Sequence, residues 1–549
     1  MGGKVAKKVI KKTIVKVSPG NAGVLTIDLF GPGMTVFHKV GLAGLWMTLK
    51  ALEDENDGNR TFDGVDGTWD RTDTSVTFRW KADPDRFFKS LIKHSFKVDK
   101  NGLLWFPALG EPMSNPQQSV VLQEAMLGTL LQHPQHKKAD QSQKPKGSIA
   151  VDINGSTIPL KYHKIYSYAH QRPNFNVTGF NSIVGWQFPG GAVRHTSPGL
   201  NDVTSLKETP GRALALRFAS LGAIFFEIRS RWSGLRPRYA LVLPEIENLS
   251  KYSNARKVFL KYGVHQLHAS GMAEAGFRVL AELKSAALIK NIHAAKCRVI
   301  SFGIVPWSTM QKTRINLMTV KAGTDRDLRT FNLCLSMFPV PRLVRPEKGE
   351  PFWDLAQMPD LVARNLVMDR TWWHSFADFL ADKERRDHIL GYVRGRTGRL
   401  IGIAIGEKGG LAKMVKDTEA FPLGAERSFV MACHEAWRRR MGQIGKKARR
   451  ENSNFGEQVN REFEKVRVSF ARCKNATSLR EAVTDFWARG GAPLKPLQDG
   501  WSDILGLLDD KNWQKARDLV LLALASYKPA TKEEAEALEG LNISNEGVE

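Results

Sequence analysis

The residues most able to do chemistry in this sequence are cations crowded into one C-terminal stretch. Residues 427–474 hold 13 Lys and Arg against 5 Asp and Glu. The candidates for phosphate contact are Arg438, Arg439, Arg440, Lys446, Lys447, Arg449, Arg450, Arg461, Lys465 and Arg467. No acid interrupts residues 438–450, whereas a merely solvated helix usually mixes both signs. This pattern favours contact with the phosphates of a polynucleotide and release of their counterions. A solvated face that binds nothing is the alternative.

Amide side chains and glycines gather in a second segment, residues 171–195 (QRPNFNVTGFNSIVGWQFPGGAVRH). The candidates for base contact are Asn174, Asn176, Asn181, Gln187, Gly190, Gly191 and Arg194. Carboxamides donate to and accept from base edges, and glycines let a backbone come close to a groove. We interpret the segment as a reading loop, with an ordinary turn as the alternative.

A third group is Arg394, Arg396 and Arg399 in the segment GYVRGRTGRL. The glycines between these arginines leave room for a phosphate chain. We expect further nucleic-acid contact here, and an exposed turn without function is the alternative.

Motifs for catalysis or metal binding are weak by comparison. The four cysteines form no CxxC pair. Asp387-His388 reverses the order of a metal-binding HD pair, and the glycine-rich residues 405–420 lack the GxxxxGK[ST] phosphate-binding loop. We therefore predict no enzyme activity, no cofactor and no metal site. A metal-dependent nuclease whose acids converge only in the fold is the competing class.

The whole chain is strongly basic. Its 549 residues include 81 Lys and Arg against 56 Asp and Glu, a formal net charge of +25. Such a surplus repels itself in the folded state unless a polyanion relieves it, and nucleic acid is the commonest polyanion. The longest apolar run, residues 213–228, is interrupted by Arg217 and Glu227. We expect a protein of the reducing cytoplasm that binds nucleic acid and no membrane.

Hydrophobic periodicity outlines the elements that must position these groups. Alternation predicts a strand at residues 24–30. A helix is expected at residues 35–52, where Gly41 and Gly44 would allow close backbone packing. Further strands are expected at residues 75–80, 239–243, 298–305 and 314–320, and a further helix at residues 274–294.

From about residue 352 onward helices dominate. Phe429, Cys433 and Trp437 are spaced i, i+4, i+8 on one helical face. Later stripes comprise Val459, Phe463, Val466, Phe470 and Cys473, then Leu479, Val483, Phe486 and Trp487, then Trp501, Ile504, Leu505 and Leu508, and last Trp513, Ala516 and Val520. The fold class predicted is therefore α+β, a mixed N-terminal region followed by a C-terminal helical bundle.

The opening of the chain carries a recognisable pattern. Residues 25–52 read LTIDLFGPGMTVFHKVGLAGLWMTLKAL, a strand ending in DLF and then an H-K-x-G-L-A-G-L helix. This opening resembles that of the large subunit of a type I CRISPR surveillance complex (Cascade), in the myxan-type branch. The match is carried by Asp28, Leu29, Phe30, His38, Lys39, Gly41, Leu42, Ala43, Gly44 and Leu45. WQFPGGAVRH and the order of the regions also agree.

The resemblance implies a non-enzymatic subunit of an antiviral, RNA-guided DNA-binding complex. Such a subunit binds the 5′ end of the guide RNA, recognises the motif that flanks the target (the PAM), and holds the DNA strands during R-loop formation. The implied partners are guide RNA, double-stranded DNA, the displaced single strand, the Cascade backbone subunits, a small subunit, and either a helicase–nuclease or transposition proteins. The C-terminal cations would then hold the displaced strand, and residues 171–195 would read the PAM. A basic RNA-binding structural protein unrelated to CRISPR is the remaining alternative.

On this basis five segments are expected. They are a basic flexible arm (1–16), an α+β large-subunit domain (17–345), a helical connecting region (346–413), a bundle resembling the small subunit (414–530) and an acidic tail (531–549). In related systems the bundle is also made separately from an internal start. Met414 is the candidate here, because codons for Lys408-Gly409-Gly410 can form a ribosome-binding sequence just upstream.

Overall fold

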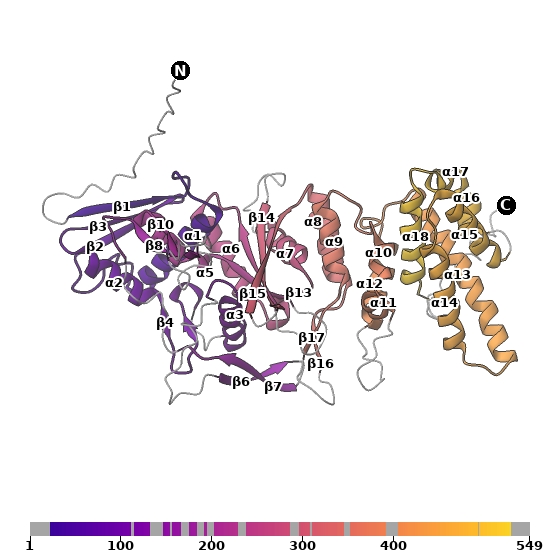
Figure 1. Ribbon diagram of the computed structural model, residues 1–549, viewed down its shortest axis with the longest axis horizontal. Coiled ribbons are helices and arrows are strands. Elements are labelled where there is room, and N and C mark those ends of the chain that lie inside the picture. Colours follow the sequence, from indigo (N-terminus) through magenta and orange to yellow (C-terminus); the bar gives the residue numbers. More distant parts are fainter. Residues whose placement is uncertain are drawn as a thin grey trace, which may run out of the picture. The chain divides into compact units, whose positions relative to one another are not determined.

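The computed structural model describes residues 22–110, 115–131, 146–153, 156–165, 175–183, 192–194, 203–228, 238–285, 296–307, 310–344, 352–390, 404–491 and 494–528 (Figure 1). The chain divides into two compact units, Met1–Ala322 and Gly323–Glu549. Sheets and helices mix in the first unit, and the second ends in a run of helices. The predicted fold class is confirmed.

The first unit begins with a three-stranded antiparallel sheet in the order β1-β3-β2. Its strands are β1 (Gly23–Asp28), β2 (Gly67–Arg71) and β3 (Ser75–Trp80). Buried and exposed residues alternate along β1, so Leu25 and Ile27 face the core. α2 (Pro84–Ser95) packs Phe87 edge-on against Phe78 of this sheet. Both strands predicted in this segment are confirmed.

α1 (Val36–Glu55) is the helix expected after the first strand, and it packs on two short helices from much later in the chain. These are α4 (Pro210–Arg217) and α5 (Ala219–Gly222). Most of α1 from Val40 to Leu49 is buried. Such all-round burial is typical of a helix that forms the centre of a core.

Glycines bring α1 and its two partners together backbone to backbone. A Cβ on Gly41 would collide with the carbonyl oxygen of Ala215, and a Cβ on Gly44 with that of Phe218. From the opposite side, a Cβ on Gly222 would collide with the backbone of α1. The close packing that the sequence predicted for Gly41 and Gly44 is confirmed.

A polar cluster fixes the beginning of α1. His38 Nδ1 lies 2.8 Å from the Oγ1 of Thr35, and His38 Nε2 lies 3.4 Å from Glu208 Oε1. Glu208 also accepts from Nε of Arg212 at 2.5 Å, and Arg212 Nη1 donates to the carbonyl of Pro32 at 3.3 Å. His38 therefore links α1 to Glu208, which lies just before α4, the helix that Gly41 of α1 also contacts.

A five-stranded sheet in the order β13-β11-β12-β14-β15 forms the second core of this unit. Its strands are β11 (Ile224–Ile228), β12 (Arg238–Pro244), β13 (His268–Ala269), β14 (Lys296–Trp307) and β15 (Met310–Lys321). Only β11 and β13 pair in parallel. On one face α7 (Met272–Ser285) brings Gly276 against Val299, and on the other α3 (Pro116–Gly128) lies against Tyr239.

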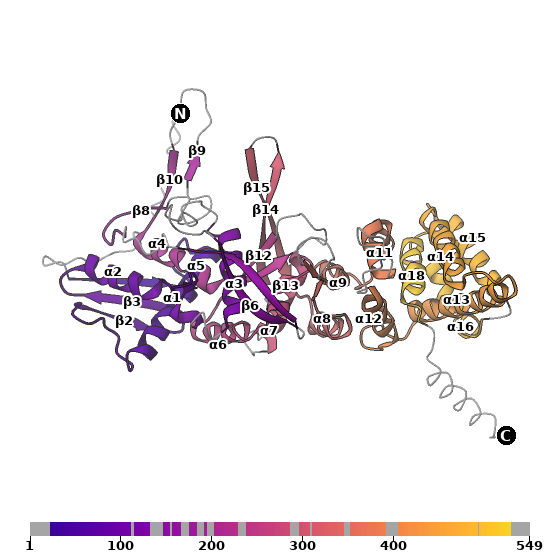
Figure 2. The same ribbon diagram turned by 90° about the horizontal axis from the view of Figure 1, so that it is seen from below.

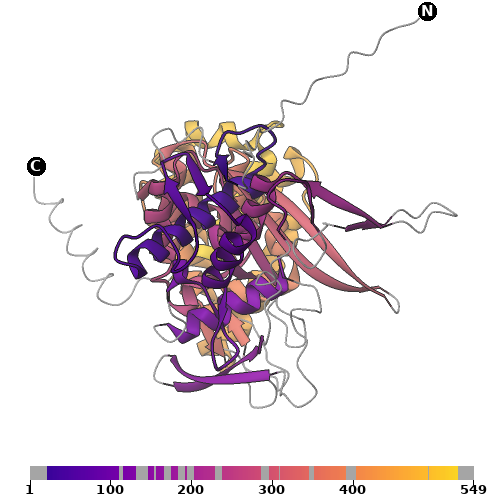
Figure 3. The same ribbon diagram turned by 90° about the vertical axis from the view of Figure 1, so that its left-hand side faces the viewer.

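The two strands of the β14–β15 hairpin are longer than the other strands of their sheet. β12 pairs with β14 as far as Phe302, whereas β14 and β15 stay paired up to Trp307 and Met310. The end of the hairpin therefore extends past the other strands (Figures 2 and 3). The strands predicted at residues 239–243, 298–305 and 314–320 are confirmed. Of the helix predicted at 274–294, the part up to Ser285 is α7, and the rest lies outside the described residues.

Small sheets and short helices complete the first unit, and the last of these sheets, β16 with β17, belongs to the second unit. The remaining strands are β4 (Lys97–Val98) paired with β5 (Leu104–Trp105), β6 (Lys146–Ile153) with β7 (Ser156–His163), β8 (Asn181–Ile183) and β9 (Ala192–Arg194) with β10 (Val203–Glu208), and β16 (Arg342–Val344) with β17 (Phe352–Asp354). The short helices are α6 (Leu249–Phe259), η1 (Pro107–Leu109) and η4 (Val264–Leu267).

The second unit consists mainly of helices. They are α8 (Asp325–Met337), α9 (Met358–Val367), α10 (Phe376–Ala381), α11 (Lys383–Leu390), α12 (Ala404–Lys416), α13 (Ala425–Arg450), α14 (Phe455–Ala471), α15 (Ala476–Arg489), α16 (Lys495–Asp499), α17 (Trp501–Leu505), η6 (Gly506–Leu508) and α18 (Trp513–Ser526). α18 is buried at every position from Asp518 to Ser526 and contacts α10, α12, α13, α14 and α15. It is the central helix of the bundle.

Most of the apolar stripes predicted for the bundle are buried. Phe429, Cys433 and Trp437 of α13 face the core, and Phe463 of α14 packs edge-on against Trp437. The stripe that runs through α17 and η6 is an exception, because Trp501 and Leu505 of α17 are exposed while Ile504 of α17 and Leu508 of η6 are buried. A helix of five residues has room for only one buried face, so two of its apolar side chains point to solvent.

A buried carboxylate joins the first helices of the second unit to the centre of its bundle. Asp518 of α18 accepts hydrogen bonds at 2.8 Å from the backbone N–H groups of Ser375 and Ala377, at the start of α10. The carboxylate thus satisfies backbone donors that α10 itself leaves unpaired. Burial raises the pKa of Asp518 to about 6.

The glycine contact predicts that Gly44→Ala destabilises the first unit. The added methyl group meets backbone atoms, which move less easily than side chains, so we expect the free energy of unfolding to fall by about 2 kcal/mol. Gly442→Ala is the control: it lies inside α13 with open space around it and should raise stability by about 0.5 kcal/mol. Urea unfolding measures the free energy of unfolding of both variants, and an equal change in the two would contradict the prediction.

The raised pKa of Asp518 predicts a specific dependence on pH. Between about pH 4 and pH 6 the unfolded chain ionises this group while the folded chain retains the proton, so the free energy of unfolding falls as pH rises. A shift of about two units corresponds to about 3 kcal/mol. Relative to the parent protein, Asp518→Asn should therefore gain stability from pH 4 to pH 7 in urea titrations. Asp503→Asn, at an exposed position, is the control. A difference in free energy of unfolding between Asp518→Asn and the parent that does not change with pH would contradict the raised pKa of Asp518.

Candidate nucleic-acid interface

The predicted phosphate-contact residues lie on the helical hairpin of α13 and α14. The turn between the two helices is short, and Asn454 caps α14 by accepting a hydrogen bond at 3.2 Å from the N–H of Glu457. Trp437 and Phe463 hold the helices together from the inside. The hairpin end extends away from α16 and α17 (Figure 1). Cations on the outer faces of both helices are exposed, among them Arg449 and Arg450 of α13 and Arg461 and Lys465 of α14.

Three consecutive arginines in the middle of α13 are already paired. Glu435 accepts from Arg438 at 2.8 and 2.9 Å and from Arg439 at 2.7 Å. Hydrogen bonding by Arg438 holds the pKa of this carboxyl below its usual range. Arg440 donates at 2.9 Å to Glu462 of α14. The interpretation from sequence overlooked both acids, because one lies a turn earlier and the other lies on the next helix.

The cations at the end of α13 are freer. Lys446, Arg449 and Arg450 are exposed, and none forms an ion pair with another residue of the described chain. Lys447 has only a long contact, 3.8 Å, with the exposed Glu451. The hairpin end is therefore a concentrated, solvent-facing source of positive charge.

The cations of α14 are likewise of two kinds, exposed ones with little or no pairing and one that is mostly buried and paired. Arg461 is 83% exposed and reaches Glu457 only at 3.9 Å, and Lys465 is exposed without an ion pair among the described residues. Arg467 is 12% exposed and donates to Glu464 at 2.8 Å. Arg461 and Lys465 are one helical turn apart and share a face, whereas Arg467 points inward.

In the expected reading loop, the two asparagines that the structure describes hold the backbone. Asn176 Oδ1 accepts from the N–H groups of Thr178 and Gly179 at 3.0 Å. The Asn181 side chain accepts from the N–H of Asn176 and donates to its carbonyl, both at 2.8 Å. These bonds build a tight turn that presents Phe180 with 68% exposure. Base contact by this loop stays a prediction.

The other predicted contacts are not placed by the structure. Asn174, Gln187, Gly190, Gly191, Arg394, Arg396 and Arg399 lie outside the described residues. Arg194 ends strand β9, opposite Val203 of β10, and only its backbone is described.

One buried polar cluster was missed by the sequence analysis. His388 is fully buried between Asp354 of β17, at 3.2 Å, and Glu407 of α12. Glu407 also accepts from the N–H groups of Gln357 and Met358, at 2.6 and 2.8 Å, at the start of α9. This network joins four elements of the second unit, and no spacing in the sequence signals it. The described residues offer no group of three side chains suited to a metal ion.

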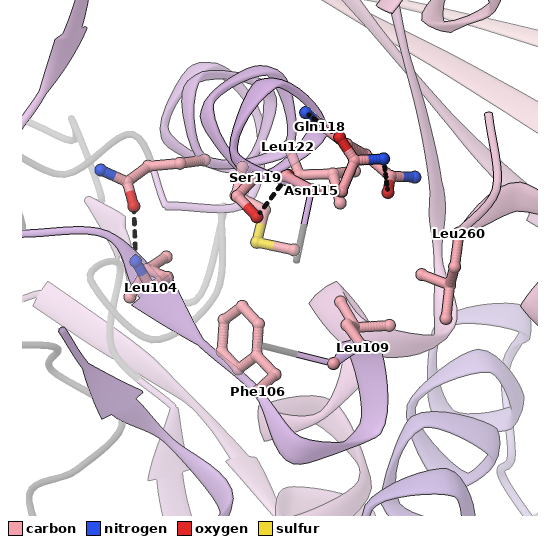
Figure 4. Close-up of a pocket in the computed structure, with 11 residues that line it drawn as sticks. Leu104, Phe106, Leu109, Asn115, Gln118, Ser119, Leu122 and Leu260 are labelled. Carbon is pink, nitrogen blue, oxygen red and sulfur yellow. Dashed lines mark hydrogen bonds between the residues drawn. The ribbon is translucent and has the colours of Figure 1, made fainter. Parts of the chain in front are cut away.

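A cavity of about 260 Å³ lies in the first unit beside α3 (Figure 4). Its polar lining is already engaged: Gln118 donates to the carbonyl of Phe259 at 2.6 Å, and Gln123 accepts from the N–H of Leu104 at 2.7 Å. Apolar side chains such as Phe106 supply the rest of its wall. The cavity therefore presents no group poised for chemistry. None of the described helices has the length and apolar character of a bilayer span.

Sequence comparison defines the class of protein. Residues 26–217 match the family model described as the DevT N-terminal domain, and residues 421–546 match the DevT C-terminal domain. The chain belongs to the DevT family of CRISPR-associated proteins, of Cas8a1/Csx13 type. It is 26% identical to the CRISPR-associated protein Cas8a1/Csx13 of Myxococcus xanthus (strain DK1622), over 93% of this chain and 90% of the relative. The resemblance predicted from residues 25–52 is confirmed.

Proposed function

We propose that this protein is the large subunit of a type I Cascade complex. In this role it binds the 5′ end of the guide RNA, recognises the PAM and holds DNA strands while the R-loop forms. The observation that carries the proposal is the set of exposed cations at the end of the α13–α14 hairpin that form no ion pair among the described residues, in a chain with a net charge of +25. The DevT membership of both parts of the chain supports it.

The hairpin end is assigned to the displaced DNA strand. Exchange of a DNA duplex for an RNA–DNA duplex is nearly balanced in free energy, so contacts with phosphates can tip it. Lys446, Arg449 and Arg450 have no ion pair to break within the described part of the chain before they bind a phosphate. For Arg438 and Arg439, a phosphate would have to compete with the carboxylate of Glu435. Binding by the free cations is therefore less costly.

PAM recognition is assigned to residues 171–195. Asn176 and Asn181 act there as the frame of the loop, because their carboxamides bind its backbone. Base contact then falls to the other candidates of the segment, among them Asn174, Gln187 and Arg194.

The protein works without turnover in the cytoplasm and assembles with guide RNA, backbone subunits and a small subunit. The complex then recruits a helicase–nuclease or transposition proteins. No metal or cofactor enters this scheme. The strands are separated by pairing with the guide, and the protein supplies fixed positive charge.

The charge assignment is tested by a triple variant, Lys446→Ala with Arg449→Ala and Arg450→Ala. Loss of three phosphate contacts should weaken binding of a single-stranded oligonucleotide and reduce the slope of log K against log salt by about 2. Fluorescence anisotropy at several salt concentrations measures both. In the same titrations with Mg²⁺ the oligonucleotide should remain full length.

The matched control removes three exposed cations elsewhere on the second unit, Arg480, Lys495 and Lys511. It changes the net charge equally and should leave the salt slope nearly intact. Glu435→Gln, which releases Arg438 and Arg439, should strengthen binding. Equal slopes for the two triple variants would reject the hairpin end as the contact site.

Separate production of the bundle is tested at Met414. This residue is fully buried in α12, so Met414→Leu keeps an apolar side chain in the core while removing the start codon. We expect the parent gene to yield a short product that contains the bundle, and the variant gene to yield only the full chain. Immunoblotting against the C-terminus measures this, and a short product unchanged by Met414→Leu would dismiss the internal start.

A further inference from the structure

An exposed aromatic ring lies at the end of the α13–α14 hairpin. Phe455, the first residue of α14, is 47% exposed although the described aromatics of this bundle are mostly buried. The ring rests on α13 at Gly445, where an added Cβ would lie 3.6 Å from its Cε2 atom. One side of the ring is thus seated on a backbone without a side chain, and the rest faces solvent.

The surface of α13 beside this ring is open. Gly442 lies one turn before Gly445, and apart from the helix's own backbone no atom of the described residues lies within 4 Å of where its Cβ would be. Arg449 lies one turn after Gly445 on the same face. A ring, a bare length of helix and a free guanidinium are therefore neighbours.

Charge distinguishes this ring from the other exposed aromatic of the bundle. Trp501 is 45% exposed, but it is flanked by the exposed acids Asp499 and Asp503. Phe455 also has exposed acids nearby in the sequence, Glu451 and Glu457, but these lie 3.8 Å from Lys447 and 3.9 Å from Arg461. The same end of the bundle holds Lys446 and Arg449, which have no ion pair within the described chain, so its cations outnumber its acids. A polyanion is therefore repelled from Trp501 and attracted to Phe455.

We propose that the hairpin end stacks an unpaired base on Phe455 while Lys446 and Arg449 hold the adjacent phosphates. The proposal rests on the cation site of the proposed function and adds a mode of recognition to it. Every base has a π face, so stacking is independent of sequence, but bases inside a duplex are already stacked and paired. The ring thus makes the site selective for single strands, where phosphate contact alone would accept either form.

The test compares Phe455→Leu with Phe455→Trp in the full chain. Leu keeps apolar area and removes the aromatic face, and Trp restores an aromatic face. The probes are a thymidine 20-mer, a uridine 20-mer of RNA, an abasic deoxyribose-phosphate 20-mer and a 20-base-pair duplex. Trp501→Leu is the matched control for loss of an exposed ring, and circular dichroism verifies that each variant is folded.

Phe455→Leu should weaken binding of the base-bearing single strands on the order of 10-fold. Phe455→Trp should restore it, and affinity for the abasic strand and the duplex should not change. A loss with either the DNA or the RNA 20-mer supports the proposal and tells which strand occupies the site. Unchanged affinity of Phe455→Leu for both base-bearing strands, or an equal loss with the abasic strand, would overturn the proposal.

Failure of the stacking proposal is distinguishable from failure of the proposed function. Lys446→Ala with Arg449→Ala lowers affinity for all four probes if the cation site is real. If this double variant keeps its affinity, the phosphate site itself is ruled out. If only Phe455→Leu keeps its affinity, stacking on Phe455 is ruled out and the phosphate site stands.

Discussion

The first unit depends on one contact between backbones, where α1 meets α4 and α5 through glycines. Each of Gly41, Gly44 and Gly222 occupies a place that even a methyl group would overfill. The contact joins residues near the start of the chain to residues about 170 positions later. His38 and Glu208 add a polar link between the same segments. Three residues of the family-resembling pattern, His38, Gly41 and Gly44, therefore take part in closing this long-range contact.

Local structure could be predicted from the sequence wherever burial follows a simple period. Alternation located β1 and β3, and the i, i+4 spacing located the buried face of α13. Prediction failed for α17, where Trp501 and Leu505 face solvent, because a stripe in a very short helix does not reveal how many neighbours cover it.

The candidate site could be predicted only in part, because ion pairing is a property of three dimensions. A count of charges between residues 438 and 450 finds no acid, yet Glu435 and Glu462 form ion pairs with the first three arginines. The carboxamides of Asn176 and Asn181 read as free donors in the sequence but bind backbone in the fold. The His388 network brings together residues 354, 388 and 407, and no periodicity can reveal that.

The position of the free cations within α13 explains how the folded chain tolerates them. Of these cations, Arg449 and Arg450 lie in the last turn of the helix, where unpaired carbonyl groups create a partial negative charge. That field offsets part of the mutual repulsion, by roughly 0.3–1 kcal/mol per cation, without an acid side chain that would later compete with a ligand. Arg438 and Arg439 lie in the middle of the helix, where no such field exists, and there Glu435 compensates them. The helix thus keeps unpaired charge at the one place where its own backbone can stabilise it, and that place is the solvent-exposed end of the hairpin.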